Sequence, residues 1–408
     1  MGGHQSIVAL YARNGGRLLL ERAPDGWRGL ERPLEDTPEE TAASILTDVL
    51  DAPEGSNIVT LGDPIVGDDR EVELVPVLAE VYSRELTENA DGLEWRHATD
   101  IVSPGDSSEW SAYRSIGPTR SSVIEDVERG STALSLDALQ LLRDEAATGA
   151  SWNDIVSTAL DIIESRGELT ALVSRVDRTM NRAASADDRL TALSRIACEE
   201  IDEAVQADAE AASRAAHYCE GKTILTLSQS GTVQAALSEG RPSAVYLLES
   251  RPECEAVPVA ETLASEDIDV SLLLDAGLGD VMCRRDIDVV LIGADSVSPN
   301  GDVWNKVGTR TLVTNAYHEG IPVIAVTSSD KIAHEPSTEV WVDGSEIYDG
   351  PHDITTDCRM FDRTPPDLIT TLVTEVGELT PNITVWIAAE RRKHRVWRDH
   401  PERLTQAG

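Results

Sequence analysis

The 408-residue sequence is short of lysine, phenylalanine, cysteine and long apolar runs, and each shortage excludes a class of protein. Basic residues number 35 and acidic residues 73, a formal net charge of -38. Because nucleic acids and anionic lipids are held by basic surfaces, this balance argues against either as a partner. The longest apolar runs, at 288–294 and 321–326, are too short to cross a bilayer. The five cysteines form no CxxC pair, so no zinc knuckle or disulfide framework is indicated, and we expect no metal or cofactor.

The residues that are present indicate a folded protein adapted to salt. Hydrophobic residues make up 41% of the chain, enough for packed cores. There is one phenylalanine, and all but four of the basic residues are arginine. Many acids with few lysines and few large apolar residues are typical of an extreme halophile, in which molar salt screens the repulsion. Since no signal peptide is recognisable at the N-terminus, we expect a cytoplasmic protein.

The first hundred residues predict an α+β domain. Residues 6–11 and 17–21 read as strands, and Asn14-Gly-Gly16 between them reads as a hairpin turn. Thr37-Pro-Glu-Glu40 is typical of a helix start with a capping box and proline in the first turn. Further strands are expected at 59–61 and 71–81. The stretch 103–134 is rich in Ser, Gly and Pro and is interpreted as a linker.

The rest of the chain divides into a helical segment and an α/β segment. Apolar residues recur at helical spacing from 135 to about 218, which predicts four or five helices. After Gly221, strands alternate with helices. The strands are predicted at 223–227, 244–248, 269–274, 289–292, 323–326 and 339–342, and the helices at 232–239, 258–265, 278–283 and 310–318. This alternation predicts a parallel sheet covered by helices on both faces, with ligands at the carboxyl ends of its strands.

Two strand-end loops carry residues suited to binding a phosphate. Thr226-Leu-Ser-Gln-Ser-Gly-Thr232 joins a strand to a helix and leaves backbone amides free, which makes Ser230, Gly231 and Thr232 candidate ligand-binding residues. The next strand ends near Arg251, a natural anion clamp. Tight turns without a ligand, and an arginine paired with a surface carboxylate, are the structural alternatives.

The most informative stretch is 288–309. A buried strand delivers Asp295 to its carboxyl end, and Asn305 and Lys306 follow a turn at Asn300-Gly301. A chain that uses arginine almost everywhere keeps a lysine here, which indicates a need for a compact donor. A structural Asp–Lys pair is the alternative.

These motifs resemble the alpha/beta/delta family of translation initiation factor 2B, which includes methylthioribose-1-phosphate isomerase and ribose-1,5-bisphosphate isomerase. The resemblance is carried by Gly-Ala-Asp295, Asn305-Lys-Val-Gly-Thr309, Glu249-Ser-Arg-Pro252 and Phe361-Asp-Arg-Thr-Pro-Pro-Asp-Leu368, and it covers about residues 136–385. It implies a helical part followed by a Rossmann-like domain, and self-association as a homodimer or higher homo-oligomer. No link to translation initiation follows from the residues themselves.

The resemblance also assigns roles. It implies that Asp295 is a catalytic acid/base, that Asn305 and Lys306 contact a sugar phosphate, and that Arg251 clamps a phosphate. The family isomerases carry a cysteine in the first loop, where this chain has Ser228. A hydroxyl is several pK units harder to ionise than a thiol, so Ser228 needs a partner to act as acid or base.

The N-terminal region resembles a Nudix domain that has lost its catalytic helix. Glu35-Asp-Thr-Pro-Glu-Glu40 is similar to the Nudix helix entry, but the segment that should supply magnesium ligands reads Ser44-Ile-Leu-Thr-Asp-Val49. Ile45 and Val49 cannot bind a metal, and only Asp48 of the three expected acids is present. We expect a Nudix-like domain without hydrolysis, able to bind a nucleotide or a partner.

The sequence therefore predicts an α/β multidomain protein: a Nudix-like domain (1–102), a linker (103–134), a helical domain (135–220), a Rossmann-like domain (221–390) and a tail (391–408). The first function hypothesis is a regulatory protein that binds a phosphorylated sugar or nucleotide. The alternative is an aldose-phosphate isomerase that uses Asp295, and a distant third is a Nudix-type hydrolase. The Ser228 exchange favours binding, the retained Asp295 and Lys306 favour catalysis, and the residues leave the question of an enzyme open.

Overall fold

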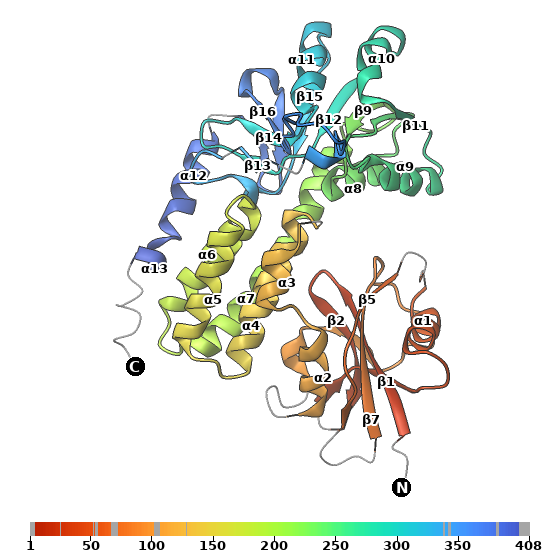
Figure 1. The fold of residues 1–408 in the computed structure, drawn as a ribbon, viewed down its shortest axis with the longest axis vertical. Helices are drawn as coiled ribbons and strands as arrows, with labels where there is room; N and C mark the ends of the chain where they lie inside the picture. The colour runs from red at the N-terminus through yellow and green to blue at the C-terminus, as the bar shows by residue number, and fades with distance from the viewer. Residues whose placement is uncertain are drawn as a thin grey trace. The chain divides into compact units, whose positions relative to one another are not determined.

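A computed structural model gives the structure of residues 5–24, 26–51, 53, 56–66, 72–101, 107–127, 129–337, 339–341, 344–380 and 383–399. The chain forms two compact units, and many of their elements are labelled in Figure 1. The first unit comprises Met1–Ser165, Thr179–Asp202 and Trp397–Gly408, and the second comprises Arg166–Arg178 and Glu203–Val396.

The first unit contains a mixed sheet. Its strands are β1 (Gln5–Asn14), β2 (Arg17–Ala23), β3 (Gly26–Arg28), β4 (Leu30–Pro33), β5 (Asn57–Leu61), β6 (Ile65–Val66), β7 (Val72–Glu80) and β8 (Leu93–Arg96). The central order is β3-β2-β1-β7-β5, and β4, β6 and β8 pair with β1, β7 and β2. The predicted hairpin is confirmed: β1 and β2 are antiparallel, and Gly15 and Gly16 turn between them with positive φ.

Helices cover both faces of this sheet. On one face α1 (Pro38–Val49) buries Ala42, Ile45, Leu46 and Val49 against alternate residues of the strands. The predicted capping box is confirmed, because the Thr37 side chain accepts from the Glu40 amide while the Glu40 carboxylate accepts from the Thr37 amide. On the other face α2 (Ser108–Ile116) buries Trp110, Tyr113 and Ile116.

The interpretation of 103–134 as a linker is wrong for the residues that the structure describes. Three helices occupy it: α2, α3 (Arg120–Glu125) and the start of α4 (Ser131–Ala147). Two short helices capped by Ser107 and Thr119 look like a loop in the sequence, because serine and threonine serve there as caps. The burial of Trp110 and Tyr113 makes α2 part of the N-terminal core.

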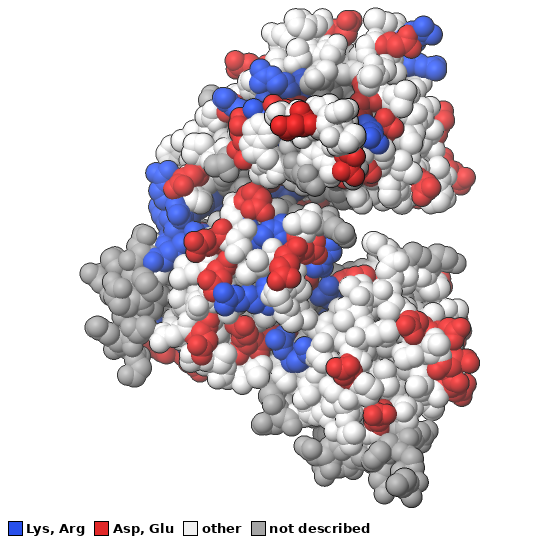
Figure 2. Space-filling view, viewed as in Figure 1, with Lys and Arg blue, Asp and Glu red and all other residues white. Residues whose placement is uncertain are grey.

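Four long helices follow, within the number predicted: α4, α5 (Trp152–Ser165), α6 (Thr170–Ala184) and α7 (Arg189–Ala216). The last two contribute residues to both units. In the stretch predicted as a tail, the described residues 391–399 form the end of α12 (Thr384–Lys393) and α13 (Val396–Asp399). Figure 2 shows basic side chains gathered over these two helices.

The second unit is built on a parallel sheet, as predicted. Its strands are β9 (Thr223–Leu227), β10 (Ala244–Leu248), β11 (Val270–Leu273), β12 (Val289–Ile292), β15 (Val323–Val326), β17 (Thr371–Thr374) and β18 (Gly377–Leu379), in the order β11-β10-β9-β12-β15-β17-β18. All neighbours are parallel except β17 and β18. Side chains alternate between two cores, one with α8 (Gly231–Gly240), α9 (Ala256–Ser265) and the end of α7, the other with α10 (Leu278–Arg284), α11 (Thr309–Glu319) and α12.

A small antiparallel sheet lies beside the parallel one and was not predicted. It consists of β13 (Ser296–Val297), β14 (Val303–Lys306) and β16 (Phe361–Thr364). The strand predicted at 339–342 is not formed by the described residues 339–341, where Trp341 makes an isolated bridge to Arg359. The remaining short elements are the 3₁₀ turns η1 (Ala98–Asp100), η2 (Asp275–Gly277), η3 (Ser329–Lys331), η4 (Gly344–Glu346) and η5 (Pro366–Leu368).

Within the described residues, none of the helices is both long enough and apolar enough to cross a membrane. Nor does that part of the chain bring three or more His, Cys, Asp or Glu residues together in a way that could hold a metal ion.

Candidate functional site

The strand order reverses between β9 and β12, the place where open parallel sheets usually bind their ligands. From β9 the chain proceeds outward through β10 and β11, and from β12 it proceeds in the other direction through β15. At such a reversal the two loops that leave the strands diverge and open a crevice at the carboxyl edge of the sheet. Here those loops carry Ser228 and Asp295, respectively.

Ser228 is held in a strained conformation and bonded to a carboxylate. Its φ is 64°, a left-handed value that costs a non-glycine residue about 1–2 kcal/mol. Its hydroxyl donates to Oε2 of Glu255 across 2.5 Å. Sequence reasoning missed Glu255, because one carboxylate among 73 acidic residues carries no signal of its own. The hydroxyl therefore has the partner that an active serine would need.

Lys306 is buried on β14 and faces two carboxylates. Its Nζ donates to Glu253 Oε2 at 2.6 Å and to Glu255 Oε1 at 2.8 Å. Burial acts to lower the pKa of Lys306, but the hydrogen bonds to both glutamates outweigh it, and the net pKa is raised. Lys306 therefore stays charged and links Glu253 to the Glu255–Ser228 pair.

Asp295 has the electrostatics of an acid/base group. Burial raises the pKa of this carboxyl above its ordinary value. The positive charges of Lys331 and Lys306 oppose that shift, whereas the negative charge of Glu255 adds to it. The Asp295 amide donates to the Trp304 carbonyl at 2.8 Å, which fixes the residue against β14. A carboxyl with a raised pKa accepts a proton more readily than an ordinary aspartate, which suits a group that must accept and return one.

Lys331 is a second lysine that the structure adds to the site. Its Nζ donates to the carbonyl of Ala294 at 2.9 Å, directly beside Asp295. The residue before it, Asp330, binds Arg175, Arg178 and Arg391 at 2.8, 2.6 and 2.7 Å, and these ion pairs hold the turn η3. Lys331 is also one of the four lysines of the chain, so the scarcity that singled out Lys306 could have singled out Lys331 as well.

The proposed phosphate end of the site lies at the start of α8. Ser230 caps this helix by accepting from the amide of Val233 at 3.4 Å. A Cβ at Gly231 would meet nothing within 4 Å, so the space above the helix N-terminus is open, whereas a Cβ at Gly293 would meet the Ser230 hydroxyl oxygen at 2.8 Å. Thr232 follows within the first turn of the helix. Helix N-termini favour anions because their first amides lack partners.

Asn305 and Arg251 have different positions. The Asn305 side chain is buried, donates to the Thr309 hydroxyl at 3.0 Å, and would lie 3.6 Å from a Cβ at Gly293, so it lies beside the loop that follows β12. Arg251 is exposed, and its Nη1 lies 3.7 Å from the sulfur of Cys254. Burial acts to raise the pKa of Glu253, but its hydrogen bond to Lys306 outweighs burial and lowers the net pKa, and the charge of Arg251 adds to this lowering. Asp275 accepts from the amides of Ser250 and Arg251 and fixes this loop.

The C-terminal motif at 361–368 contacts the strand and the helix that adjoin the candidate site. Asp362 on β16 accepts from the amides of Gly308 at 2.8 Å and Arg310 at 3.1 Å, and so caps α11. In the same strand pair, Asn305 lies opposite Asp362 and Lys306 lies opposite Phe361. The motif thus holds the strand that carries both predicted ligand contacts.

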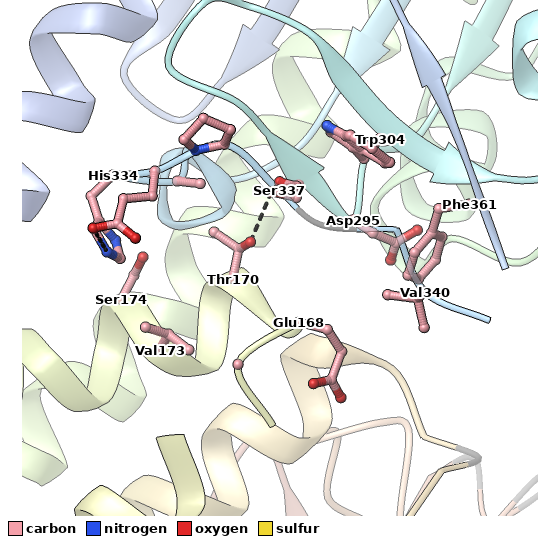
Figure 3. Close-up of a pocket in the computed structure, with 15 residues that line it drawn as sticks. Glu168, Thr170, Val173, Ser174, Asp295, Trp304, His334, Ser337, Val340 and Phe361 are labelled. Atoms are coloured by element: carbon pink, nitrogen blue, oxygen red, sulfur yellow. Dashed lines mark hydrogen bonds and ion pairs between the residues drawn. The ribbon is translucent and has the colours of Figure 1, made fainter. Parts of the chain in front are cut away.

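A cavity of about 190 Å³ opens beside Asp295. Figure 3 shows the Asp295 carboxyl next to Phe361 and Val340, with Glu168 and Thr170 across the cavity. Thr170 bonds Ser296, which in turn bonds Ser337, at 2.8 and 2.6 Å. Of the predicted site residues, Asp295 lines this cavity. The others are not among its lining residues: Ser228, Ser230, Gly231, Thr232, Arg251, Asn305 and Lys306.

Comparisons with known proteins agree with this architecture. The chain is 28% identical over 307 residues to methylthioribose-1-phosphate isomerase of Pseudomonas putida (strain GB-1), covering 66% of this chain and 85% of that protein. It is 35% identical over 158 residues to the enzyme of the same name from Ectopseudomonas mendocina (strain ymp), covering 36% of this chain and 44% of that protein.

Solved structures share the fold. The 5-methylthioribose 1-phosphate isomerase of Pyrococcus horikoshii OT3 matches with a TM-score of 0.55 and 21% identity, over 67% of this chain and 86% of that one. A chain of the tetrameric eIF2B-beta2-delta2 complex from C. thermophilum matches with a TM-score of 0.54 and 21% identity, over 67% and 92%. The Initiation factor 2 subunit family matches residues 127–381, more than half of the chain. The chain therefore belongs to the initiation factor 2 subunit family.

Proposed function

We propose that the second unit is an aldose–ketose isomerase acting on a phosphorylated pentose of the methylthioribose-1-phosphate or ribose-1,5-bisphosphate type. The observation that carries the proposal is Asp295: a carboxyl with a raised pKa, at a cavity wall on the crevice edge of the sheet, next to Lys331. The relatives at 28% and 35% identity, both named methylthioribose-1-phosphate isomerase, favour this function over the regulatory alternative.

Isomerisation needs one group to move a proton between neighbouring carbons. The 1-phosphate occupies the anomeric oxygen, so the substrate has no free carbonyl. Asp295 in its ionised form takes the proton from C2, the hydroxyl-bearing carbon next to the anomeric carbon, as the bond between C1 and the ring oxygen breaks. The electron pair left behind forms an enediolate, and Asp295 returns the proton to the adjacent carbon. Its raised pKa brings the two protonation states closer in energy at neutral pH, and the charges of Lys306 and Lys331 stabilise the negative enediolate.

A second group must move a proton from the C2 hydroxyl to the ring oxygen, so that the ring opens and C2 becomes the ketone. In the isomerases that the sequence resembles, a cysteine occupies the Ser228 position. Here the Ser228 hydroxyl passes its proton to Glu255 as it accepts one from the substrate, and the pair reverses the transfer afterwards. Lys306 balances the charge of Glu255. The pair thus supplies the base that a lone hydroxyl lacks.

The substrate phosphate would bind at the start of α8. The amides of Ser230, Gly231 and Thr232 lie at the helix N-terminus, the space above Gly231 is open, and Arg251 is the nearby exposed cation of the next loop.

The test is a phosphorus and proton NMR time course in molar KCl with each of the two substrates. The wild-type protein is expected to build up a ketose phosphate, and Asp295→Asn to slow this by at least about 10²-fold. Asp280→Asn, which alters an exposed carboxylate on α10, is the matched control and should turn over as wild type. If the substrate signals broaden on adding protein but no substrate converts, the protein binds without catalysis. The regulatory function would then replace the isomerase.

For the first unit we propose a Nudix-like domain without hydrolase activity. Ile45 and Val49, which stand where metal-binding acids are needed, are buried in the core under α1. Incubation with nucleoside diphosphate compounds and Mg²⁺ should release no phosphate above that of a no-enzyme control. Metal-dependent release that disappears in Asp48→Asn would contradict this proposal.

We further propose that the protein works as a homo-oligomer. Val385 and Trp386 on α12 are 54% and 77% exposed, an unusual state for large apolar side chains next to one another. Light scattering in molar KCl should give a mass of at least twice 44.1 kDa, and a monomeric mass at micromolar concentration would contradict it.

A further inference from the structure

Several side chains line the cavity beside Asp295 without a role in the proposed reaction. The cavity measures about 190 Å³, far more than one water molecule needs, and all of its lining residues belong to the second unit. In that reaction the phosphate on C1 binds at the start of α8 and C2 lies at Asp295. The rest of the sugar, C3 to C5 with its substituent, therefore extends past Asp295, and the cavity is the space beside Asp295 that can receive it.

Two polar groups of the cavity wall have no partner in the described part of the chain. The Asp295 carboxyl accepts no hydrogen bond there, and the Ser174 hydroxyl forms none, although Ser174 is only 5% exposed. Figure 3 shows both side chains at the cavity. Since buried polar groups in proteins are nearly always hydrogen-bonded, these two indicate that a polar ligand completes the wall.

Three further hydroxyls of the cavity lining are joined to one another. Thr170 on α6 donates to Ser296 on β13 at 2.8 Å, and the Ser296 and Ser337 hydroxyls lie 2.6 Å apart. A hydroxyl can donate one hydrogen bond and accept two, so the three retain capacity beyond the bonds they share. This hydroxyl row, Thr170–Ser296–Ser337, can therefore bond the hydroxyl groups of a sugar.

Apolar side chains make up another part of the lining. They are Val173, Trp304, Val340 and Phe361. The indole nitrogen of Trp304 donates to the Ser298 hydroxyl at 3.0 Å, so its polar atom is already bonded and the rest of the ring is apolar. Ligand pockets combine such surfaces with a few polar groups that fix the orientation of the ligand. This part of the cavity suits an apolar substituent, such as a thioether.

The cavity is acidic. Its lining includes three carboxylates and one histidine but, among the described residues, neither lysine nor arginine. Arg166 binds Glu168 at 2.8 Å and Arg395 binds Glu335 at 2.7 Å, so both arginines are paired and neither lines the cavity. His334 lies 3.8 Å from Glu335. A phosphate in this cavity would lose its water without gaining a lysine or arginine partner and would face the carboxylates, which is unfavourable.

We propose, on the basis of the isomerase function above, that this cavity selects a pentose 1-phosphate with an uncharged substituent on C5, such as a thioether, and rejects a 1,5-bisphosphate. The hydroxyl row binds the sugar hydroxyls, and the apolar part receives the C5 substituent. Glu168 is the specificity-determining residue, because its side chain is 28% exposed against 59% for Glu335, so solvent and salt screen its charge less. Its carboxylate repels a second phosphate.

The test compares kcat/KM for three substrates that differ only at C5: methylthioribose 1-phosphate, ribose 1-phosphate and ribose 1,5-bisphosphate. Wild-type protein in molar KCl should prefer the first to the bisphosphate by at least about 10²-fold, with ribose 1-phosphate between them. In Glu168→Gln this preference should fall about tenfold, chiefly through faster conversion of the bisphosphate. Asp280→Asn, which alters an exposed carboxylate on α10, should keep the wild-type preference.

The outcomes separate this proposal from the isomerase function. Conversion of the thioether and the bisphosphate with equal kcat/KM, or a preference that Glu168→Gln leaves unchanged, would overturn the proposal while the isomerase function stands. If none of the three converts, the isomerase function fails, and calorimetry then reads the preference as a ratio of Kd values. Methylthioribose 1-phosphate bound at least about tenfold more tightly than the bisphosphate would support the selective cavity, and equal binding would overturn it.

Discussion

At the scale of single residues, Glu255 is the centre of the candidate site. One of its oxygens accepts from Ser228 and the other from Lys306, and its charge also reaches Asp295. A single carboxylate therefore couples the two groups that the proposed reaction needs. It explains how a serine can stand where a cysteine is expected without removing the proton path.

Replacing Glu255 by glutamine is expected to slow turnover and to shift its pH dependence. The amide cannot take the Ser228 proton, so kcat should fall by about 10²-fold. Because the Glu255 charge raises the pKa of Asp295, its removal lowers that pKa, and the acidic limb of the kcat/KM profile moves to lower pH. Rates measured from about pH 4 to 9 give both effects.

Glu253→Gln is the matched control for that variant. It removes a Lys306 partner without touching Ser228, and the Glu253 side chain is 41% exposed, so kcat should fall less than about tenfold. Equal losses in the two variants, with no shift of the acidic limb in Glu255→Gln, would show that Glu255 merely pairs with Lys306.

Asp330→Asn is expected to destabilise the protein strongly. The buried carboxylate faces three arginines, and removing its charge leaves them uncompensated, at a cost of about 3–5 kcal/mol in the free energy of unfolding. The arginines hold the pKa of Asp330 well below its usual value, so its stabilisation is complete above about pH 4 and is lost as the pH falls through the folded-state pKa.

Urea unfolding of wild type and Asp330→Asn in molar KCl measures this cost. The wild type should lose stability on acidification more steeply than the variant, because the variant lacks this titration. Asp280→Asn, at an exposed pair, should stay within about 0.5 kcal/mol of wild type. A similar small change for Asp330→Asn would contradict the prediction.

At the scale of elements, the helices and strands that could be predicted are those marked by a pattern within a short stretch of sequence. The strands 223–227, 244–248 and 289–292 are short buried apolar runs between turn residues, and the structure has them with the same bounds. The start of helix α1 could be predicted because its capping box, Thr37 with Glu40, is visible in the sequence. The sheet of β13, β14 and β16 could not be predicted, since its strands have two to four residues and β14 and β16 are more than fifty positions apart.

The cap of α11 by Asp362 tests whether that small sheet supports the site. Asp362→Ala leaves the amides of Gly308 and Arg310 without their acceptor, which should cost about 1–3 kcal/mol of unfolding free energy. Since Lys306 lies on the strand beside Asp362, kcat/KM should fall as well. Asp367→Ala, at an exposed position in the neighbouring turn, is the control. If Asp362→Ala loses stability but keeps the full kcat/KM, the cap of α11 does not support the site.

At the scale of the whole molecule, the site was predicted more fully for rare residues than for common ones. Asp295 and Lys306 were found because one ends a buried strand and the other is a scarce lysine. Glu253 and Glu255 were missed, because acids are abundant and their contacts with Lys306 span 53 and 51 positions. Only the folded chain brings such residues together.

The net charge of -38 predicts that salt governs stability. Figure 2 shows acidic side chains in groups scattered over the visible surface, one of them near α1. Raising KCl from about 0.1 M to about 2 M shortens the screening length several-fold, weakens the repulsion between carboxylates and should raise the melting temperature. Calorimetry across this range checks it, with a neutral osmolyte as control. A melting temperature that falls or stays constant with KCl would contradict the proposed halophilic adaptation.

The central claim is that Asp295 makes the second unit an isomerase, and one NMR experiment tests it most directly. Methylthioribose 1-phosphate is mixed with wild type, Asp295→Asn and Asp280→Asn in parallel tubes, and the phosphorus spectrum is followed. The account predicts a growing ketose phosphate signal with wild type and Asp280→Asn, and almost none with Asp295→Asn. Conversion at the same rate by Asp295→Asn, or no conversion by wild type despite line broadening that reports binding, would contradict it.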